Sequence, residues 1–263
     1  MAKTTKLSEN PLIVTLSALL CKLNSEGLEL NISKGNDKMG DIPYLSMPAG
    51  EDPIIRSDGI VLRDFTGTCK GCCNGCQHDC YALRTEYQYD YCRYNYAVNY
   101  VLAAYAPEEF EKQFCKYLKN ANIRCFRLHE SGEFFSWEYF EMICRIFSKF
   151  PRIQFYAYTK RYSWVRRAQD LGIIPENFKI NISARRENSA ALKKYLPEFT
   201  QFIWDCSNIA GNNSESVCCD HCPAVSFNGK KTGITCLECE RCIYGNCDTA
   251  VYDHSGKQKH KKS

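Results

Sequence analysis

The chain has 263 residues, which suits one large domain or one domain with an appendage. Hydrophobic residues make up 44% of the chain, enough to build a core, and the net charge of +4 is too mild to indicate a nucleic-acid partner by itself. The outlier is the cysteine content. Of 18 cysteines, five lie in residues 66–82 and seven in residues 218–247.

The N-terminal region bears on whether these cysteines form disulfides, which need an oxidising compartment. Residues 11–21 resemble a short export signal that ends at a lipoprotein cysteine. However, Glu9 interrupts the basic leader, and Leu20 is too large for the position before such a cysteine. The stretch is also too short to span a membrane. We therefore expect a cytoplasmic protein without a membrane partner, in which clustered thiols bind metal.

The first part of the chain is predicted to pack on the rest. Residues 11–21 are expected to form a buried strand or a short helix, and the alternation in residues 28–32 predicts a strand. Six glycines and prolines in residues 34–57 indicate a loop. Alternation returns in residues 58–65, a predicted strand that leads directly into the first cysteine cluster.

The segment 66–82 is a candidate metal-binding loop. Its five cysteines lie within twelve positions: Cys69, Cys72, Cys73, Cys76 and Cys80. The subset Cys69, Cys73 and Cys76 has the spacing with which radical S-adenosylmethionine (SAM) enzymes hold a [4Fe–4S] cluster, and the subset Cys72, Cys76 and Cys80 is an alternative. A zinc knuckle is the structural alternative to a cluster.

Strands and helices alternate from residue 123 onwards. A helix over 81–105 and a second over 107–118 come first. Strands are then predicted at 123–129, 152–158, 177–183 and 201–205, with helices at 136–149, 162–171 and 188–195. Together with the strand 58–65, this order predicts an α/β fold with parallel strands, as a partial or complete β/α barrel; a doubly wound sheet is the second choice.

Each predicted strand has one apolar and one polar face. Residues Phe155 and Ala157 alternate with Tyr156 and Tyr158, for example. On the last strand, the alternation assigns Phe202 and Trp204 to the helix side and Gln201 and Asp205 to the polar side. A polar inner face fits a barrel lumen lined for a ligand, and the exposed face of an open sheet is the alternative.

Polar residues also follow the strands at their carboxyl ends, where active sites of β/α folds collect. They include the stretch His129-Glu130-Ser131-Gly132-Glu133, Lys160, Ser183, Arg185 and Asp205. We expect the side chains of His129, Glu133, Lys160, Arg185 and Asp205 to converge on one cavity. Glu133, His129, Lys160 and Asp205 are the candidate catalytic residues.

The last part of the chain forms a second cysteine-rich segment. Residues 211–250 follow the domain 58–210 through a linker-like stretch, and residues 251–263 form a basic tail. Paired CxxC elements predict one metal centre made by Cys222, Cys236, Cys239 and Cys242. A second [4Fe–4S] cluster and a structural zinc ion are both compatible with this spacing.

The chain resembles the phage gene product 88 family, a cysteine-rich group from phages and mobile elements. The matching stretches are Thr68-Cys69, Cys80-Tyr81-Ala82, Arg127 to Glu133, Tyr156 to Lys160, Cys222-Pro223-Ala224 and the run Cys236, Cys239, Cys242. The family in turn is similar to radical SAM barrels. This resemblance implies that Ser131, Gly132 and Glu133 correspond to a SAM-binding Gly-Gly-Glu motif, although a serine takes the first position. Ser183 and Arg185 are then further candidates for binding SAM.

Two functions from different classes follow. The first is a radical SAM-like enzyme that acts on a nucleic acid base or a peptide, in the host cytoplasm if a phage encodes it. The second is a zinc-stabilised nucleic-acid-binding module that uses lysine and arginine side chains at the strand ends to bind phosphates.

Overall fold

The computed structural model describes residues 10–71, 76–77, 80–204, 220–223, 232–245 and 247–251. The chain divides into two compact units, and each is discontinuous in sequence. The first, which we call the helical unit, comprises Met1–Ser33, Tyr44–Asn122 and His129–Phe150. The second, the sheet unit, comprises Lys34–Pro43, Ile123–Leu128 and Pro151–Ser263. These boundaries differ from the predicted segments, whose role as domains stays a prediction.

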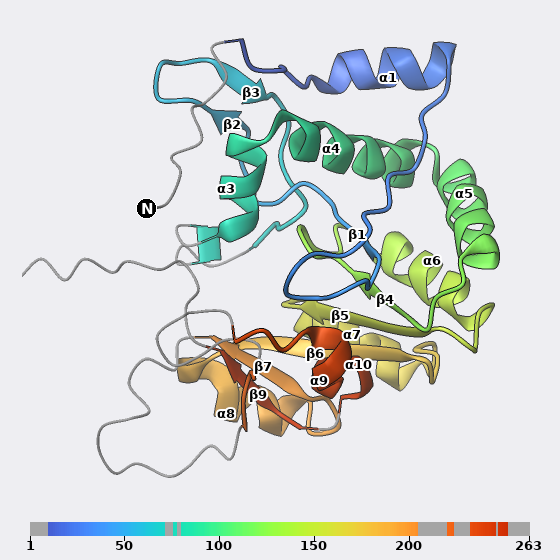
Figure 1. Ribbon diagram of the computed structural model, residues 1–263, viewed down its shortest axis with the longest axis vertical. Helices are drawn as coiled ribbons and strands as arrows, with labels where there is room; N and C mark the ends of the chain where they lie inside the picture. The colour runs from blue at the N-terminus through green and yellow to red at the C-terminus, as the bar shows by residue number, and fades with distance from the viewer. Residues whose placement is uncertain are drawn as a thin grey trace, which may run out of the picture. The chain divides into compact units, whose positions relative to one another are not determined.

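The helical unit contains helices and very short strands (Figure 1). They are α1 (Leu16–Ser25), β1 (Tyr44–Leu45), β2 (Ile54–Ile55), β3 (Val61–Arg63), α3 (Tyr81–Gln88), α4 (Asp90–Tyr105), α5 (Pro107–Asn120) and α6 (Trp137–Ser148). The Thr15 hydroxyl caps α1, Pro107 begins α5 with two acids in its first turn, and the Ser136 hydroxyl caps α6. Aromatic side chains of α5 and α6, such as Phe114 and Phe147, pack edge to face between the two helices.

Three predictions for this unit are wrong. The segment 28–32 is not a strand. The residue that follows it, Ser33, makes an isolated antiparallel bridge to Tyr44. The predicted helix over 81–105 breaks at Tyr89, whose extended backbone separates α3 from α4. The predicted strand 58–65 shortens to β3, which pairs antiparallel with β2. It is therefore not a strand of the parallel sheet, because β2 supplies its partner.

The sheet unit is a parallel α/β layer structure. Its elements are β4 (Cys125–Leu128), β5 (Gln154–Thr159), α7 (Tyr162–Asp170), β6 (Phe178–Arg185), α8 (Arg186–Tyr195), β7 (Gln201–Trp204), β8 (Asp220–His221), α9 (Cys236–Cys239), α10 (Arg241–Tyr244) and β9 (Thr249–Val251). Five strands run parallel in the order β4-β5-β6-β7-β9, and β8 pairs with β9. This confirms the α/β class and the parallel strands, whereas the barrel is not confirmed.

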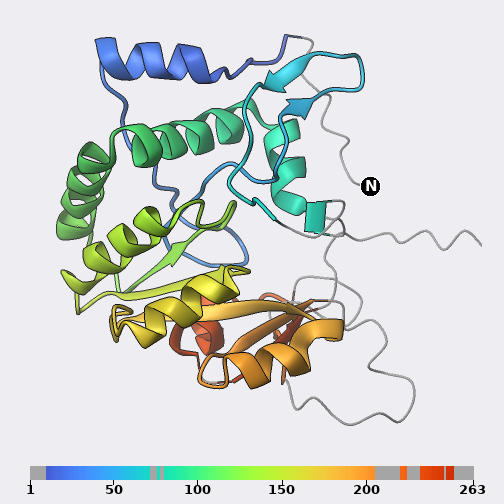
Figure 2. The same ribbon diagram turned by 180° about the vertical axis from the view of Figure 1, so that it is seen from behind.

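Helices cover both faces of this sheet. Helix α8 packs on β6 and β7, and α10 packs on β5 and β6. Figure 2 shows α7 and α8 on the near side of the strands, and Figure 1 shows α9 and α10 in red on the other side. The face that was predicted to line a wet lumen is therefore covered in part by the cysteine-rich segment.

The register also corrects the predicted faces of β7. Ser183 of β6 pairs with Phe202, and Ile182 pairs with Gln201. Neighbouring residues in register point to the same face, so Phe202 shares the polar face and Gln201 faces α8. There the Ser189 hydroxyl donates to the side-chain oxygen Oε1 of Gln201 at 2.5 Å. A buried glutamine is tolerated on the helix side because this hydrogen bond satisfies it.

Candidate functional site

The first cysteine loop begins at a fixed point of the helical unit. The Thr68 amide donates to the Pro48 carbonyl oxygen at 2.8 Å, and the Cys69 amide donates to the Gly50 carbonyl oxygen at 3.1 Å. The Thr68 side chain is fully buried, and its hydroxyl also donates to the Pro48 oxygen, at 2.7 Å. The position of Cys69 is therefore set by backbone hydrogen bonds to a segment that the sequence predicts only as loop.

The Ser131-Gly132-Glu133 stretch is locked against the same segment. The Ser131 hydroxyl donates to the Met47 carbonyl oxygen, and the Met47 amide donates to the Ser131 carbonyl oxygen, both at 2.9 Å. Gly132 has a φ of +82°, and a β-carbon there would lie 2.6 Å from the Met47 β-carbon. The Glu133 amide donates to the Thr68 hydroxyl oxygen at 2.9 Å. Glu133 thus contacts the residue that precedes Cys69.

The Glu133 side chain lies in a buried, aromatic environment. It is 8% exposed, and its carboxylate accepts a hydrogen bond from the Phe134 amide at 2.9 Å. Burial, together with the charge of Glu133, raises the pKa of Tyr139 well above its usual range. The Tyr139 hydroxyl therefore stays neutral in this environment.

His129 lies close to this group. Its Nε2 is 3.0 Å from the Tyr139 hydroxyl oxygen, and its ring packs edge to face on Phe134 with centroids 4.7 Å apart. The ring is buried, and the backbone of His129 has a positive φ of 56°. His129 is thus part of the packed aromatic cluster around Glu133, and its catalytic role stays a prediction.

A buried ion pair, which the sequence analysis missed, joins the two ends of the cysteine loop. Arg63 of β3 and Glu86 of α3 lie 2.5 Å apart, and Arg63 also donates to the carbonyl oxygens of Ala49 and Phe65. Burial raises the pKa of Glu86 to about 7, although Arg63 and the Ala49 amide favour its charged form. An arginine and a glutamate 23 positions apart, in two different predicted elements, give no local signal.

Three of the five cysteines of this loop are described. They are Cys69, Cys76 and Cys80, whereas Cys72 and Cys73 lie outside the described residues. The Cys80 sulfur caps α3 by accepting from the Leu83 amide at 3.5 Å. Burial is the main factor that raises the pKa of Cys80, and Cys76 raises it further. The choice of ligands in the first cluster stays a prediction.

Two predicted site residues of the sheet unit are in contact. The Lys160 ammonium donates to the Ser183 hydroxyl oxygen at 3.0 Å, and the Tyr162 hydroxyl donates to the Ser183 carbonyl oxygen at 2.7 Å. Arg185 follows two positions later at the end of β6. Asp205 lies outside the described residues. The predicted convergence of these residues with His129 and Glu133 stays a prediction, because those two belong to the helical unit.

The C-terminal cysteines gather on one face of the sheet. Cys222 and Phe202 form a buried cluster, against which Tyr158 and Cys242 pack. The pKa of the Cys242 thiol is raised to about 11, mainly by burial and also by the nearby thiols of Cys236, Cys222 and Cys239, although a hydrogen bond with Tyr158 lowers it. Among the residues that the structure describes, no three histidine, cysteine or carboxylate side chains are placed so that they could hold a single metal ion.

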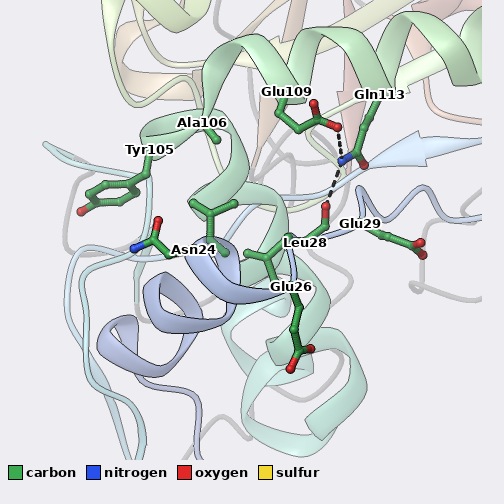
Figure 3. Close-up of a pocket in the computed structure, with 10 residues that line it drawn as sticks. Asn24, Glu26, Leu28, Glu29, Tyr105, Ala106, Glu109 and Gln113 are labelled. Atoms are coloured by element: carbon green, nitrogen blue, oxygen red, sulfur yellow. Dashed lines mark hydrogen bonds between the residues drawn. The ribbon is translucent and has the colours of Figure 1, made fainter.

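A cavity of about 510 Å³ lies elsewhere in the helical unit, between the end of α1 and the start of α5. Figure 3 shows Gln113 in the lining of this cavity. Its side-chain nitrogen donates to the Leu28 carbonyl oxygen at 2.9 Å and to the Glu109 carboxylate at 3.0 Å. The lining contains none of the predicted site residues. Within the described residues, no helix is long and apolar enough to cross a membrane.

A family model described as Gene product 88 matches residues 24–245. The chain belongs to the Gene product 88 family. The match includes the first cysteine loop, the Ser131-Gly132-Glu133 stretch and the run from Cys222 to Cys242. Comparisons with curated proteins and with solved structures gave no match. The contact between Glu133 and Thr68 thus lies inside the region that the family model matches.

Proposed function

We propose that this Gene product 88 protein is an iron–sulfur enzyme of the radical SAM type. Cys69, Cys73 and Cys76 would bind three irons of a [4Fe–4S] cluster, and Glu133 would bind the ammonium group of SAM. The observation that carries the proposal is the hydrogen bond from the Glu133 amide to the Thr68 hydroxyl. It holds the backbone of the candidate SAM-binding residue against Thr68, the residue that precedes the first candidate cluster ligand.

The residues around Glu133 fit this role. A buried carboxylate forms a stronger hydrogen bond with an ammonium group than an exposed one does, because the local dielectric is low. Gly132 lets the backbone approach the cysteine loop closely, and Thr68 and Met47 hold it there. In this proposal Glu133 would bind SAM, and Gly132, Thr68 and Met47 would orient Glu133. A bound cluster would, in its reduced state, supply the one electron that is needed to cleave SAM into methionine and a 5′-deoxyadenosyl group.

The cap on α3 supports one of the two cysteine subsets. Cys80 already has a local role as the N-cap, which favours Cys69, Cys73 and Cys76 as the cluster ligands. With three thiolates bound, one iron remains open for SAM. Glu133 would then need to lie near that iron, and the hydrogen bond from its backbone amide to Thr68, the residue before the candidate ligand Cys69, supports this.

In the sheet unit, Lys160, Ser183 and Arg185 would form a separate binding site for a polar ligand. Lys160 and Ser183 are already in contact at the carboxyl ends of β5 and β6. Ligands of β/α folds bind at this edge of the sheet, and the consecutive order of β4 to β7 fits a partial barrel. We further propose that the protein acts in the cytoplasm, where reducing conditions preserve the thiols.

The test is SAM cleavage by anaerobically reconstituted, reduced protein. We expect 5′-deoxyadenosine from the wild-type chain, at least a tenfold loss in Glu133→Gln, and no change in the control Glu138→Gln. Glu138 is an exposed carboxylate in the first turn of α6. A protein that carries iron but leaves SAM intact would rule out the radical SAM proposal.

The second candidate is the zinc-stabilised nucleic-acid-binding module. It is favoured by the position of Lys160 and Arg185 at the ends of neighbouring parallel strands, where two cations can contact phosphates. This candidate predicts colourless protein that contains zinc. Its affinity for single-stranded DNA would fall steeply as the salt concentration rises. In Lys160→Ala this dependence on salt would be weaker, because one phosphate contact is lost. Iron-containing protein whose affinity for DNA does not depend on salt would exclude it.

A further inference from the structure

The cysteine-rich end of the chain is attached to the sheet by specific contacts. The side-chain nitrogen Nδ2 of Asn181 donates to the Cys242 carbonyl oxygen at 2.9 Å and to the Ala157 carbonyl oxygen at 3.3 Å. Tyr158 and Phe202 stand on the same face of the sheet as Asn181, with ring centroids 4.7 Å apart. Cys242 packs against these two rings together with Cys222. Two chain segments thus bring thiols to one place.

The backbone around Cys236 and Cys239 is also held by specific hydrogen bonds. Thr235 and Glu238 form a capping box that begins α9, and the Cys236 amide donates to the Lys38 carbonyl oxygen at 2.8 Å. Glu240 has a left-handed backbone with a φ of 58°, which ends α9 and lets α10 begin at the next residue. The chain direction changes there, between Cys239 and Cys242.

We propose that Cys222, Cys236, Cys239 and Cys242 bind a [4Fe–4S] cluster that fastens α9 and α10 to the sheet. This site is independent of the one proposed in the helical unit. Three cysteines in a C-x2-C-x2-C run, with a remote cysteine followed by proline, have the spacing of ferredoxin-type clusters. Each thiolate of a cluster binds a different iron, so the four sulfurs stand farther apart than around one tetrahedral zinc ion. With all four irons held by protein thiolates, the cluster would carry electrons or stabilise the fold.

Tyr158 is a positioning residue for this cluster. It makes a hydrogen bond to the Cys242 sulfur, and the Arg127 guanidinium carbon lies 5.0 Å from the centroid of its ring. Hydrogen bonds and positive charge near cluster sulfurs stabilise the more negative, reduced state and raise the reduction potential. Arg127 also contacts the Met39 sulfur at 3.2 Å, which fixes the guanidinium on this face.

The first experiment measures iron and acid-labile sulfide in the full chain after anaerobic reconstitution. Cys239→Ser should lose about four irons per chain, the content of one cluster. The control Cys21→Ser, at an exposed free cysteine of α1, should lose none. Cys76→Ser should lose only the iron of the other site, so that a failure of one site is distinguishable from a failure of both. Full iron content in Cys239→Ser, or zinc in place of iron, would overturn the assignment.

The second experiment uses only the wild-type chain, because Cys239→Ser could fail to fold. Thiols are alkylated in the reconstituted protein and again after an iron chelator, and the labelled positions are identified by mass spectrometry. We expect Cys222, Cys236, Cys239 and Cys242 to react only after chelation. Cys247, which lies outside the run, should react in both states. Equal labelling of all five thiols before chelation would reject the site.

The third experiment tests Tyr158 by potentiometry. Tyr158→Phe keeps the ring and removes the hydroxyl, so the iron content should stay unchanged while the reduction potential of this cluster becomes more negative. A simple packing role would leave the potential where it is in the wild-type chain. An unchanged potential would therefore remove Tyr158 from the proposal.

Discussion

The guanidinium group of Arg63 lies 2.5 Å from the carboxylate of Glu86, and neither side chain is exposed to solvent. This pair connects the strand that precedes the first cysteine loop to the helix that follows it. Arg93 adds a hydrogen bond from its guanidinium group to the Glu86 carbonyl oxygen at 2.5 Å. The two ends of the loop are thus fixed to each other without any metal ligand taking part.

Glu86→Gln should destabilise the fold strongly above the raised pKa of Glu86, which is about 7, because the carboxylate is charged there. Removing one partner of a buried ion pair leaves the Arg63 charge uncompensated, which costs about 3–5 kcal/mol of unfolding free energy. Glu111→Gln is the matched control, because Glu111 pairs with Arg145 and Lys149 at the surface. That change should cost about 1 kcal/mol or less. Urea unfolding followed by circular dichroism measures both, and equal losses would contradict the assigned role of the pair.

Gly132→Ala should displace the Ser131-Gly132-Glu133 stretch. The new β-carbon would meet Met47 at 2.6 Å and the Thr68 hydroxyl oxygen at 2.7 Å. Overpacking of this kind costs about 1–3 kcal/mol, in addition to the strain of a positive φ.

Gly59→Ala is the control for Gly132→Ala. Gly59 has a similar φ of +86°, and a β-carbon there would meet nothing within 4 Å. The two variants therefore share the backbone strain and differ in packing. We expect Gly132→Ala to unfold at lower urea concentration than Gly59→Ala. Coincident unfolding midpoints would show that the close approach at Gly132 is unimportant.

Strands β4 to β7 could be predicted because each is an apolar run that follows a helical pattern, whereas β9 (Thr249–Val251) in the cysteine-rich segment was not predicted. The predicted strand 152–158, for instance, corresponds to β5 (Gln154–Thr159). Alternation alone did not reveal which partner a strand takes, so β3 was wrongly assigned to the parallel sheet. It also did not fix the face of Gln201, because the hydrogen bond to Ser189 that allows its burial comes from another element.

The candidate site was predictable only in part. The nearness of Glu133 to the cysteine loop follows from a resemblance, and the structure gives it a physical basis in Thr68 and Met47. Met47 lies in a stretch with no periodic pattern, so its contacts could not be inferred. The Gly67-Thr68 pair before Cys69 was the available signal, since a glycine next to a small hydroxyl residue indicates a close backbone approach.

Thr68→Val should loosen Glu133 while it preserves the shape of the side chain. The Thr68 hydroxyl donates to the Pro48 oxygen and accepts from the Glu133 amide, so its loss leaves two buried polar groups without this partner. The expected cost is about 1–3 kcal/mol. Thr68→Ser keeps the hydroxyl and should restore most of the stability. If the two variants unfold alike, the hydroxyl has no part in holding Glu133.

Asn181→Ala should release α10 from the sheet. The Asn181 side chain donates to the Cys242 carbonyl oxygen and accepts from the Thr200 hydroxyl at 2.9 Å, so it joins the sheet to the cysteine-rich segment. Without these bonds, local opening of α10 becomes easier, and trypsin should cleave after Arg241 several times faster than in the wild-type chain. Asn177→Ala is the matched control, because Asn177 donates to the Ile153 carbonyl oxygen in the same sheet unit at 3.0 Å. That variant should show wild-type cleavage after Arg241. Equal acceleration in both variants would mean that the whole unit, and not the attachment of α10, had been weakened.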